Sequence, residues 1–270
     1  MKPIIMLALL LPSLALPWNN GQSGNARTDL PEECGNPPFS THDWIAHQAL
    51  EMVPDDEKAW LVPHSAMFLL GTEAPDNSSI LASCGSPHAG YGDTGQGHSV
   101  DWNDDHTGWA LRDTGELQDR AARRAQEEYN KAVISFQQDN PSDAAFYLGA
   151  MAHYIGDVSQ YGHSAPGEDH HSDYERWVSS RSEIDDTVFT GFITASSLVR
   201  RTPYTAVKRI SKVTSEGNGQ IMSFAEMDAT YENKTGNDVY LASIGHALNL
   251  ASNELADVLH TFFLNVVDED

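Results

Sequence analysis

Hydrophobic positions along the chain repeat at helical spacing in several blocks, which polar stretches rich in Gly, Pro, Asn and Asp separate. The first block follows Ser40, a residue type that caps helices, and Asp43 stands three residues later as in a capping box. An apolar stripe then continues to Pro54, which ends it. The pattern predicts a helix at this position and a second helix over residues 55–70.

Several further blocks carry the same periodicity. They predict a helix over residues 107–138, one from Pro141 to the break at Gly162, and helices over 171–180, 183–200, 204–215 and 237–264. Residues 71–108 lose apolar periodicity, and so long a loop inside a compact domain is usually functional. No segment alternates with the period of a strand. The predicted fold class is therefore all-α, a single-domain multi-helix bundle over residues 40–266 with a long polar loop.

The N-terminal residues differ in composition from the rest of the chain. One Lys, roughly a dozen apolar residues and a small-x-small Ser-Leu-Ala triplet describe a secretory signal peptide. We therefore assign residues 1–17 to a signal peptide and residues 18–39 to an irregular arm, and we expect a secreted, extracellular protein. In an oxidising compartment the two cysteines, Cys34 and Cys84, are expected to form one disulfide.

The charge of the chain bears on which partners it can bind. The 270 residues include 39 acidic and 16 basic ones, for a formal net charge of −23. Such a surface repels the phosphates of nucleic acids and anionic membranes at long range. We therefore expect no nucleic-acid partner, although an acidic secreted protein without any catalytic function would show the same excess.

The strongest chemical signal lies between His153 and Glu175. His153 and Asp157 are four residues apart, as are His171 and Glu175, so each pair lies on one face of a helix, and His163 stands between the pairs. Imidazole and carboxylate ligands together suit zinc or another borderline divalent ion. Two amphipathic helices with partly exposed polar residues are the alternative that these five residues alone leave open.

Three upstream residues extend this set. His42 lies in the first turn of the first predicted helix, Asp76 follows Pro75, and His98 lies in the polar loop. Each is weak by itself, because the chain has 12 histidines and most histidines are not ligands. The order His, Asp, His, His-x3-Asp-x5-His, His-x3-Glu is far more specific than any of its parts.

With this order the sequence resembles the zinc-dependent phospholipases C, which share an all-helical fold with the single-strand-specific zinc nucleases. The resemblance covers about residues 40–176 and is carried by Ser40-Thr41-His42, Phe146-Tyr147-Leu148-Gly149 and His171-Ser172-x-Tyr174-Glu175. Thr41-His42-x-x-Ile45-Ala46-His47 and Gly71-Thr72-x-x-Pro75-Asp76 also resemble the N-terminal catalytic domain of glycosylphosphatidylinositol-specific phospholipase D, from the same superfamily.

The resemblance implies a site for up to three Zn²⁺ ions beneath the polar loop. Asp76, His98, His153 and Asp157 would hold the first ion, and Asp157 would bridge to a second ion that His42 also binds. His163, His171 and Glu175 would hold the third. Many family members add an N-terminal Trp, for which the matching residue is Trp18, although the small-x-small site would leave Leu16 as the new terminus. Asp76 is also the candidate general base.

The activity that the resemblance implies is hydrolysis of a phosphodiester. We expect a phospholipase C that releases diacylglycerol and a phosphorylated head group, acting as a monomer with transient contact to a membrane or micelle surface. A zinc nuclease or 3′-nucleotidase, a phospholipase D-type specificity and a non-catalytic metal-binding relative are the alternatives. The nuclease is disfavoured by the net charge of −23 and by the absence of a basic stripe in the sequence.

Overall fold

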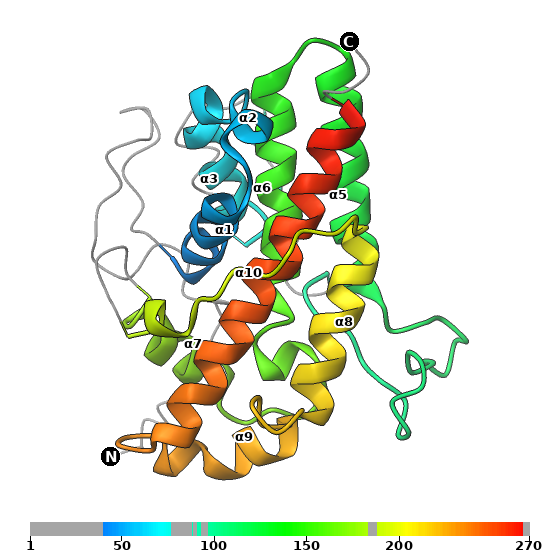
Figure 1. The fold of residues 1–270 in the computed structure, drawn as a ribbon. Coiled ribbons are helices and arrows are strands. Elements are labelled where there is room, and N and C mark those ends of the chain that lie inside the picture. Colours follow the sequence, from blue (N-terminus) through cyan, green and yellow to red (C-terminus); the bar gives the residue numbers. More distant parts are fainter. Residues whose placement is uncertain (1–39, 77–87, 89–90, 93–96, 183–187, 267–270) are drawn as a thin grey trace, which may run out of the picture.

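The computed structural model describes residues 40–76, 88, 91–92, 97–182 and 188–266. Over this part of the chain the fold is helical, as predicted, and its β-structure is limited to the isolated bridges Trp102–Trp109 and Leu111–Leu117. The α-helices are α1 (Thr41–Met52), α2 (Asp55–Lys58), α3 (Ser65–Glu73), α5 (Arg120–Gln137), α6 (Pro141–Asp157), α7 (His171–Ser179), α8 (Pro203–Glu216), α9 (Phe224–Thr230) and α10 (Asp238–Val266) (Figure 1). Four 3₁₀ turns accompany them: η3 (Val62–His64), η4 (Tyr161–His163), η5 (Thr190–Phe192) and η6 (Tyr231–Asn233).

Helix α1 begins as the sequence predicts. The Ser40 side chain accepts a hydrogen bond from the Asp43 amide, and the Asp43 carboxylate accepts one from the Ser40 amide at 3.0 Å, which completes the capping box. This cap fixes the first turn of α1, where His42 lies.

The helix predicted over residues 55–70 is wrong in its continuity. The chain forms the short helix α2, then η3, and only then α3. Pro63 lies within η3, and a proline lacks the amide proton that an α-helix requires in its interior and crowds the preceding turn. The break lets α3 turn toward α6 and carry Asp76 with it.

Helices α3 and α6 cross at very short distance through Gly71 and Gly149. A Cβ atom at Gly149 would overlap the Phe68 carbonyl, and one at Gly71 would overlap the Phe146 carbonyl. Only glycine permits this approach of two backbones. As a result the end of α3 lies beside the turn of α6 that carries His153.

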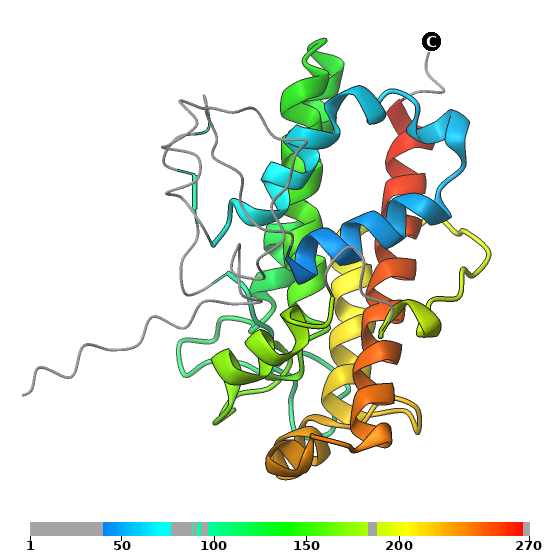
Figure 2. The same ribbon diagram turned by 90° about the vertical axis from the view of Figure 1, so that its left-hand side faces the viewer.

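The core forms where α6 is enclosed by its neighbours. Helix α6 packs against α5 on one side and α3 on the other, while α1 contacts both α6 and α10 (Figure 2). Phe146, Tyr154 and Phe262 are among its fully buried side chains. Because the core surrounds α6, polar residues near its C-terminal end are removed from water.

Two further sequence predictions are wrong at particular places. The helix predicted from residue 107 begins at Arg120, because residues 101–118 form two short antiparallel pairings instead. In the predicted helix 183–200, the described residues form η5 and then an extended segment. The amides of Thr194, Ser196 and Val199 donate to Asn249, Asn253 and Asp257 of α10 respectively, so tertiary contacts satisfy this backbone and a helix is not needed.

Some predictions fall on residues outside the described ranges. These are the signal peptide 1–17, the arm 18–39 with Trp18, and the disulfide between Cys34 and Cys84, which all stay predictions. Among the helices of the described part, none is long and apolar enough to span a membrane.

Candidate metal centre

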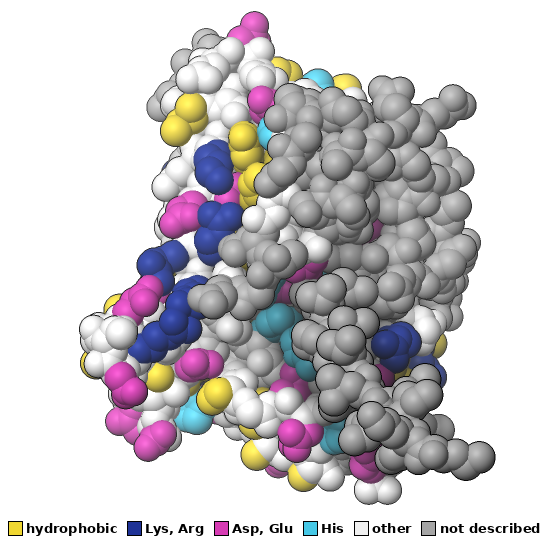
Figure 3. Space-filling view, turned by 180° about the vertical axis from the view of Figure 1, so that it is seen from behind, with side chains coloured by type: hydrophobic (Ala, Val, Ile, Leu, Met, Phe, Trp, Pro, Cys, Tyr) yellow, Lys and Arg dark blue, Asp and Glu magenta, His cyan; other side chains and the backbone are white. Residues whose placement is uncertain are grey.

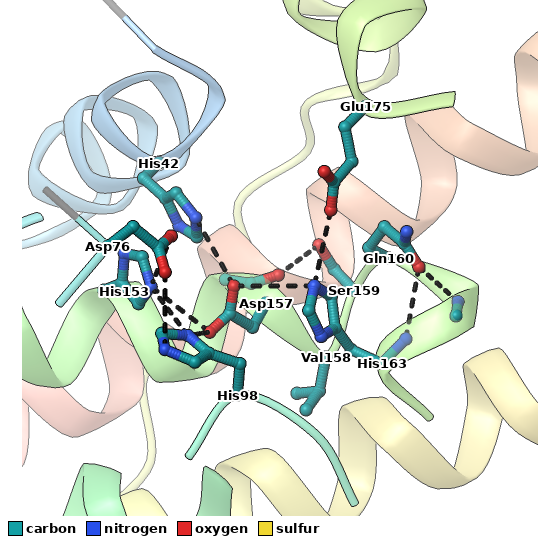
Figure 4. A network of polar contacts seen from close by, with 12 residues as sticks. His42, Asp76, His98, His153, Asp157, Val158, Ser159, Gln160, His163 and Glu175 are labelled. Atoms are coloured by element: carbon teal, nitrogen blue, oxygen red, sulfur yellow. Dashed lines mark hydrogen bonds and ion pairs between the residues drawn. The ribbon is translucent and has the colours of Figure 1, made fainter. Parts of the chain in front are cut away.

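Five of the expected ligands meet at the C-terminal half of α6. Helix α6 supplies His153 and Asp157, the first turn of α1 supplies His42, and Asp76 and His98 come from the segments that follow α3 and precede α5 (Figure 4). We call these five residues the Asp157 cluster. All of them are buried.

Asp157 is the centre of this cluster. Its Oδ2 lies 2.9 Å from His98 Nδ1 and 3.4 Å from His153 Nε2, and its Oδ1 lies 3.4 Å from His42 Nε2. Burial raises the pKa of Asp157, while the facing imidazoles of His153 and His98 oppose that rise. A buried carboxylate is costly without positive charge beside it, so this position favours a cation.

Asp76 closes the opposite side of the cluster. Its Oδ1 lies 3.3 Å from His98 Nε2, and its Oδ2 lies 3.1 Å from His153 Nε2. The two histidines therefore stand between two carboxylates. Burial lowers the pKa of His153, but Asp157 and Asp76 together outweigh it and the net shift is upward.

The backbone orients His153. Its Nδ1 donates to the Thr72 carbonyl of α3 at 2.7 Å, which directs Nε2 into the cluster. The Thr72 hydroxyl in turn donates to Asp43 Oδ1 of the α1 capping box at 2.6 Å. Metal-binding histidines commonly hold their second nitrogen in this way.

His42 packs against α6 where the helix has no side chain. A Cβ at Gly156 would lie 2.8 Å from His42 Nδ1, so a larger residue would displace this ring. The His42 ring also stacks on His153 with centroids 4.0 Å apart. Burial and then the neighbouring histidines lower the pKa of His42 well below its ordinary value, which keeps the imidazole neutral, the form that binds metals.

The remaining expected ligands form a second group, which we call the Glu175 cluster: His163 of η4, and His171 and Glu175 of α7. Glu175 Oε1 lies 3.0 Å from His171 Nε2 and 3.4 Å from His163 Nε2. Burial, followed by the charge of His171, lowers the pKa of His163 well below its ordinary value. The two clusters are neighbours, since His163 Nε2 is 3.9 Å from Asp157 Oδ1.

Glu168 contacts the Glu175 cluster through His171. Its Oε2 lies 2.6 Å from His171 Nδ1, and Gln160 Nε2 donates to its Oε1 at 3.2 Å. Burial lowers the pKa of His171, but hydrogen bonds to Glu168 and Glu175 outweigh it and raise that pKa to about 10. A side chain at Gly162 would overlap the Glu168 carboxylate, so the glycine at this position makes room for it.

The donors of both clusters fit a divalent metal. Asp157 Oδ1 and His163 Nε2 are buried and have no hydrogen-bond partner among the described residues. Groups left this way are costly unless something else binds them. Separations of 3–4 Å between donors arise when they share an ion at about 2.0–2.2 Å, and imidazole with carboxylate is a zinc ligand set. The residues present therefore suit zinc.

The residues that hold the histidines in position lie outside the predicted ligand set. Asp173, which is close to His171 in sequence, pairs with Arg176 instead. Thr72 and Glu168 take that role. Glu168 stands three residues before His171 but precedes α7, so the spacing rule for helix faces does not mark it.

Two further histidines of the polar loop, His88 and His106, contact other parts of the fold. His88 stacks on Phe146 with centroids 3.8 Å apart, and its Nε2 lies 3.1 Å from Asp143. His106 Nε2 lies 2.8 Å from the Ser215 hydroxyl of α8. Both have structural partners away from the two clusters.

Comparison with known proteins identifies the family of the chain. The family described as zinc-dependent phospholipase C matches residues 41–229, which is more than half of the chain and includes every clustered residue. The chain belongs to this family. The family expected from the sequence is thus confirmed. It is a family of zinc-dependent phospholipases C. No curated protein is significantly similar to the chain in sequence.

Solved structures agree on the fold. An alpha toxin from Clostridium absonum is 19% identical, with a TM-score of 0.52, over 90% of this chain and 66% of the toxin. A Clostridium perfringens alpha-toxin from an avian strain is 18% identical, with a TM-score of 0.52, over 85% of this chain and 64% of the toxin. The chain thus spans somewhat less than two thirds of each toxin's length, and at this identity the likeness concerns the fold.

Proposed function

We propose that this protein is a secreted zinc-dependent phospholipase C. It hydrolyses the ester bond between the glycerol and the phosphate of a phospholipid, which releases diacylglycerol and a phosphorylated head group. The observation that carries the proposal is the Asp157 carboxylate, which faces donors of both clusters within the residues that the family matches. The proposed catalytic domain is residues 40–266, preceded by the arm 18–39 and a signal peptide over 1–17.

The proposed ligand sets follow the two clusters. Asp76, His98, His153 and Asp157 would hold one zinc ion, Asp157 and His42 a second, and His163, His171 and Glu175 a third. When bound, the ions supply the positive charge that neutralises phosphate oxygens, favours ionisation of the attacking water and stabilises the leaving alkoxide. Trp18, if cleavage exposes it, would add a ligand beside His42.

The chain's own residues position and move the proton. Each Asp76 oxygen faces a different histidine, at 3.3 Å and 3.1 Å, so one oxygen can keep its histidine while the other accepts a proton from the attacking water. Thr72 and Glu168 keep His153 and His171 directed into the clusters. Asp76 is therefore our proposed general base.

We infer the direction from which the substrate approaches from the exposed fractions of the histidine side chains. The His171 side chain is 25% exposed, whereas those of His42 and His153 are completely buried. Histidine side chains are visible near the centre of the face shown in Figure 3. A phosphate head group would enter beside His171 and reach the Asp157 cluster behind it.

One experiment separates the proposed function from its alternatives. The purified protein, with its zinc content measured, is assayed on phosphatidylcholine and on single-stranded DNA. Release of diacylglycerol that a chelator abolishes and zinc restores supports phospholipase C, whereas release of phosphatidic acid indicates phospholipase D-type cleavage. DNA cleavage without lipid turnover supports the nuclease, and bound zinc with neither activity supports a non-catalytic relative.

Two further measurements on the same preparation test the remaining parts of the proposal. N-terminal sequencing of the protein recovered from the medium tests export and shows whether Trp18 is the first residue. Light scattering tests the expected monomer.

A further inference from the structure

Residues 101–118 form a double hairpin that leaves the helical bundle beside α8 (Figure 1). The hairpin starts directly at the site, because His98 belongs to the Asp157 cluster and the Val100 amide donates to the His163 carbonyl at 2.9 Å. The Asp101 and Ala110 backbones then pair, and so do those of Ala110 and Gln118. Because the hairpin begins at the edge of the metal centre, it can contact the same substrate molecule that the metal centre binds.

The base of the hairpin is fixed to α8 by aromatic residues. Trp102 Nε1 donates to Ser211 at 3.2 Å, and Trp109 Nε1 donates to the Tyr204 hydroxyl at 2.8 Å. The Lys208 ammonium lies 6.0 Å and 5.9 Å from the centroids of the two indole rings. These contacts hold the hairpin as a defined projection rather than a loose loop.

The outer hairpin presents a small apolar patch. Leu111 is 66% exposed and Leu117 is 44% exposed, and the two are bridged across the antiparallel pair. Hydrogen bonds from Arg112 to Glu116 and from Gln118 to Ala110 flank them, which makes them the closely spaced, non-hydrogen-bonded kind of pair with side chains on one face. Gly115, with φ of +80°, forms the turn beyond.

The charge of the protein bears on which kind of lipid surface could bind this patch. Residues 103–117 include the acidic residues Asp104, Asp105, Asp113 and Glu116 and the basic residue Arg112. Neighbouring helices add basic groups, since Arg123 pairs with Glu116 and Lys208 and Lys212 lie beside Trp102. The local charge is therefore mixed, while the whole chain carries −23. An anionic membrane is repelled by such a surface, whereas the outer ammonium group of a choline head group is not.

We propose that Leu111 and Leu117 are the lipid-contacting tip of this enzyme, which adsorbs to aggregated zwitterionic phospholipid and brings the head group to the metal centre. This inference rests on the proposed function, because a lipid substrate is what gives a tip beside the site its purpose. Two leucines give weak adsorption, which suits micelles and loosely packed lipid.

The test uses one lipid in two physical states. The variant Leu111→Ser/Leu117→Ser is assayed with the zinc-loaded protein on dihexanoyl phosphatidylcholine below and above its critical micelle concentration. The expected result is an unchanged rate on dispersed lipid and a fall of about tenfold on micelles, since the lost contact is worth about one decade in adsorption. The matched control Val62→Ser/Val239→Ser removes residues that are 62% and 68% exposed elsewhere on the molecule and should change neither rate.

Binding gives a readout that does not depend on catalysis. Flotation with small, highly curved phosphatidylcholine vesicles, whose lipid is loosely packed, should be lost in the leucine variant and kept in the control. Added phosphatidylserine should weaken wild-type flotation. Equal rates of wild type and variant on micelles, equal losses on both lipid states, or a failure of the wild type to float would each overturn the inference. A dimer that the leucine variant abolishes would also overturn it and assign the patch to self-association. Flotation that depends on the leucines, in a protein without lipid turnover, would keep the tip and refute the proposed function instead.

Discussion

Replacing Asp157 with Asn is the most informative single change. The substitution keeps the shape of the side chain but removes the carboxylate charge that faces His42, His98 and His163 at 3.4, 2.9 and 3.9 Å. Burial raises the pKa of Asp157, so the ionised carboxylate is costly when no metal is bound, and the neutral amide avoids that cost. We therefore expect the metal-free variant to fold and to be about as stable as the wild type.

The metal-loaded protein should behave differently. An ion bound at 100 times its dissociation constant stabilises the fold by about 2.7 kcal/mol, and for a chain of this size each kcal/mol corresponds to about 2–4 °C in Tm. Losing one such ion should thus remove about 5–11 °C of the stabilisation that zinc confers. Loss of a buried electrostatic contact to the reacting groups also lowers kcat by at least about a hundredfold.

The assay combines three measurements on wild type and variant: zinc per chain, Tm with and without zinc, and phosphatidylcholine turnover. The control is Asp173→Asn, which neutralises a carboxylate on α7 whose side chain is 69% exposed and paired with Arg176. Asp157→Asn should lose at least one zinc ion and its share of the Tm increase, while the control loses neither. A variant that keeps the full zinc content and activity would refute the central position given to Asp157.

Three further outcomes follow from single contacts. Glu168→Gln should weaken zinc binding about 10–100-fold at the Glu175 cluster, because Glu168 orients His171; zinc titration checks this, and unchanged affinity would contradict it. Gly149→Ala should destabilise the fold by about 1–3 kcal/mol in urea denaturation, since its Cβ would overlap backbone of α3, whereas Gly191→Ala, where the Cβ meets open space, should be tolerated. Hydrogen bonds from the N-cap serine of α9 lower the pKa of Glu226, so its stabilising contribution is present above the ordinary carboxyl pKa and is lost as pH falls through the lowered value. The stability difference between wild type and Glu226→Gln should therefore shrink on acidification, and a difference independent of pH would count against the capping box.

The sequence allowed the clusters to be predicted because their chemistry is local. His153 with Asp157 and His171 with Glu175 share helix faces by spacing alone, and the capping box of Ser40 and Asp43 positions His42. The convergence of Asp76 and His98 on these pairs came from the family resemblance. Spacing could not supply it, since it depends on the crossing of α3 and α6 at Gly71 and Gly149.

The errors arose where tertiary contacts replaced local preference. The predicted helix included residues 107–119, which contain Gly108 and Gly115, and Trp102 and Trp109 hold this segment in the hairpin against α8. The segment after η5 is extended because side chains of α10 bind its amides. Glu168 was missed because it lies in the irregular segment before α7, where no helix periodicity marks a carboxylate.

The most direct test of the account is a crystal structure of the zinc-loaded protein with anomalous scattering measured at the zinc absorption edge. The account predicts separate zinc peaks in the two clusters, with Asp157 ligating at least one ion and His163, His171 and Glu175 surrounding another. Absence of zinc beside Asp157, or a structure in which His42 and His163 point away from its carboxylate, would contradict the account.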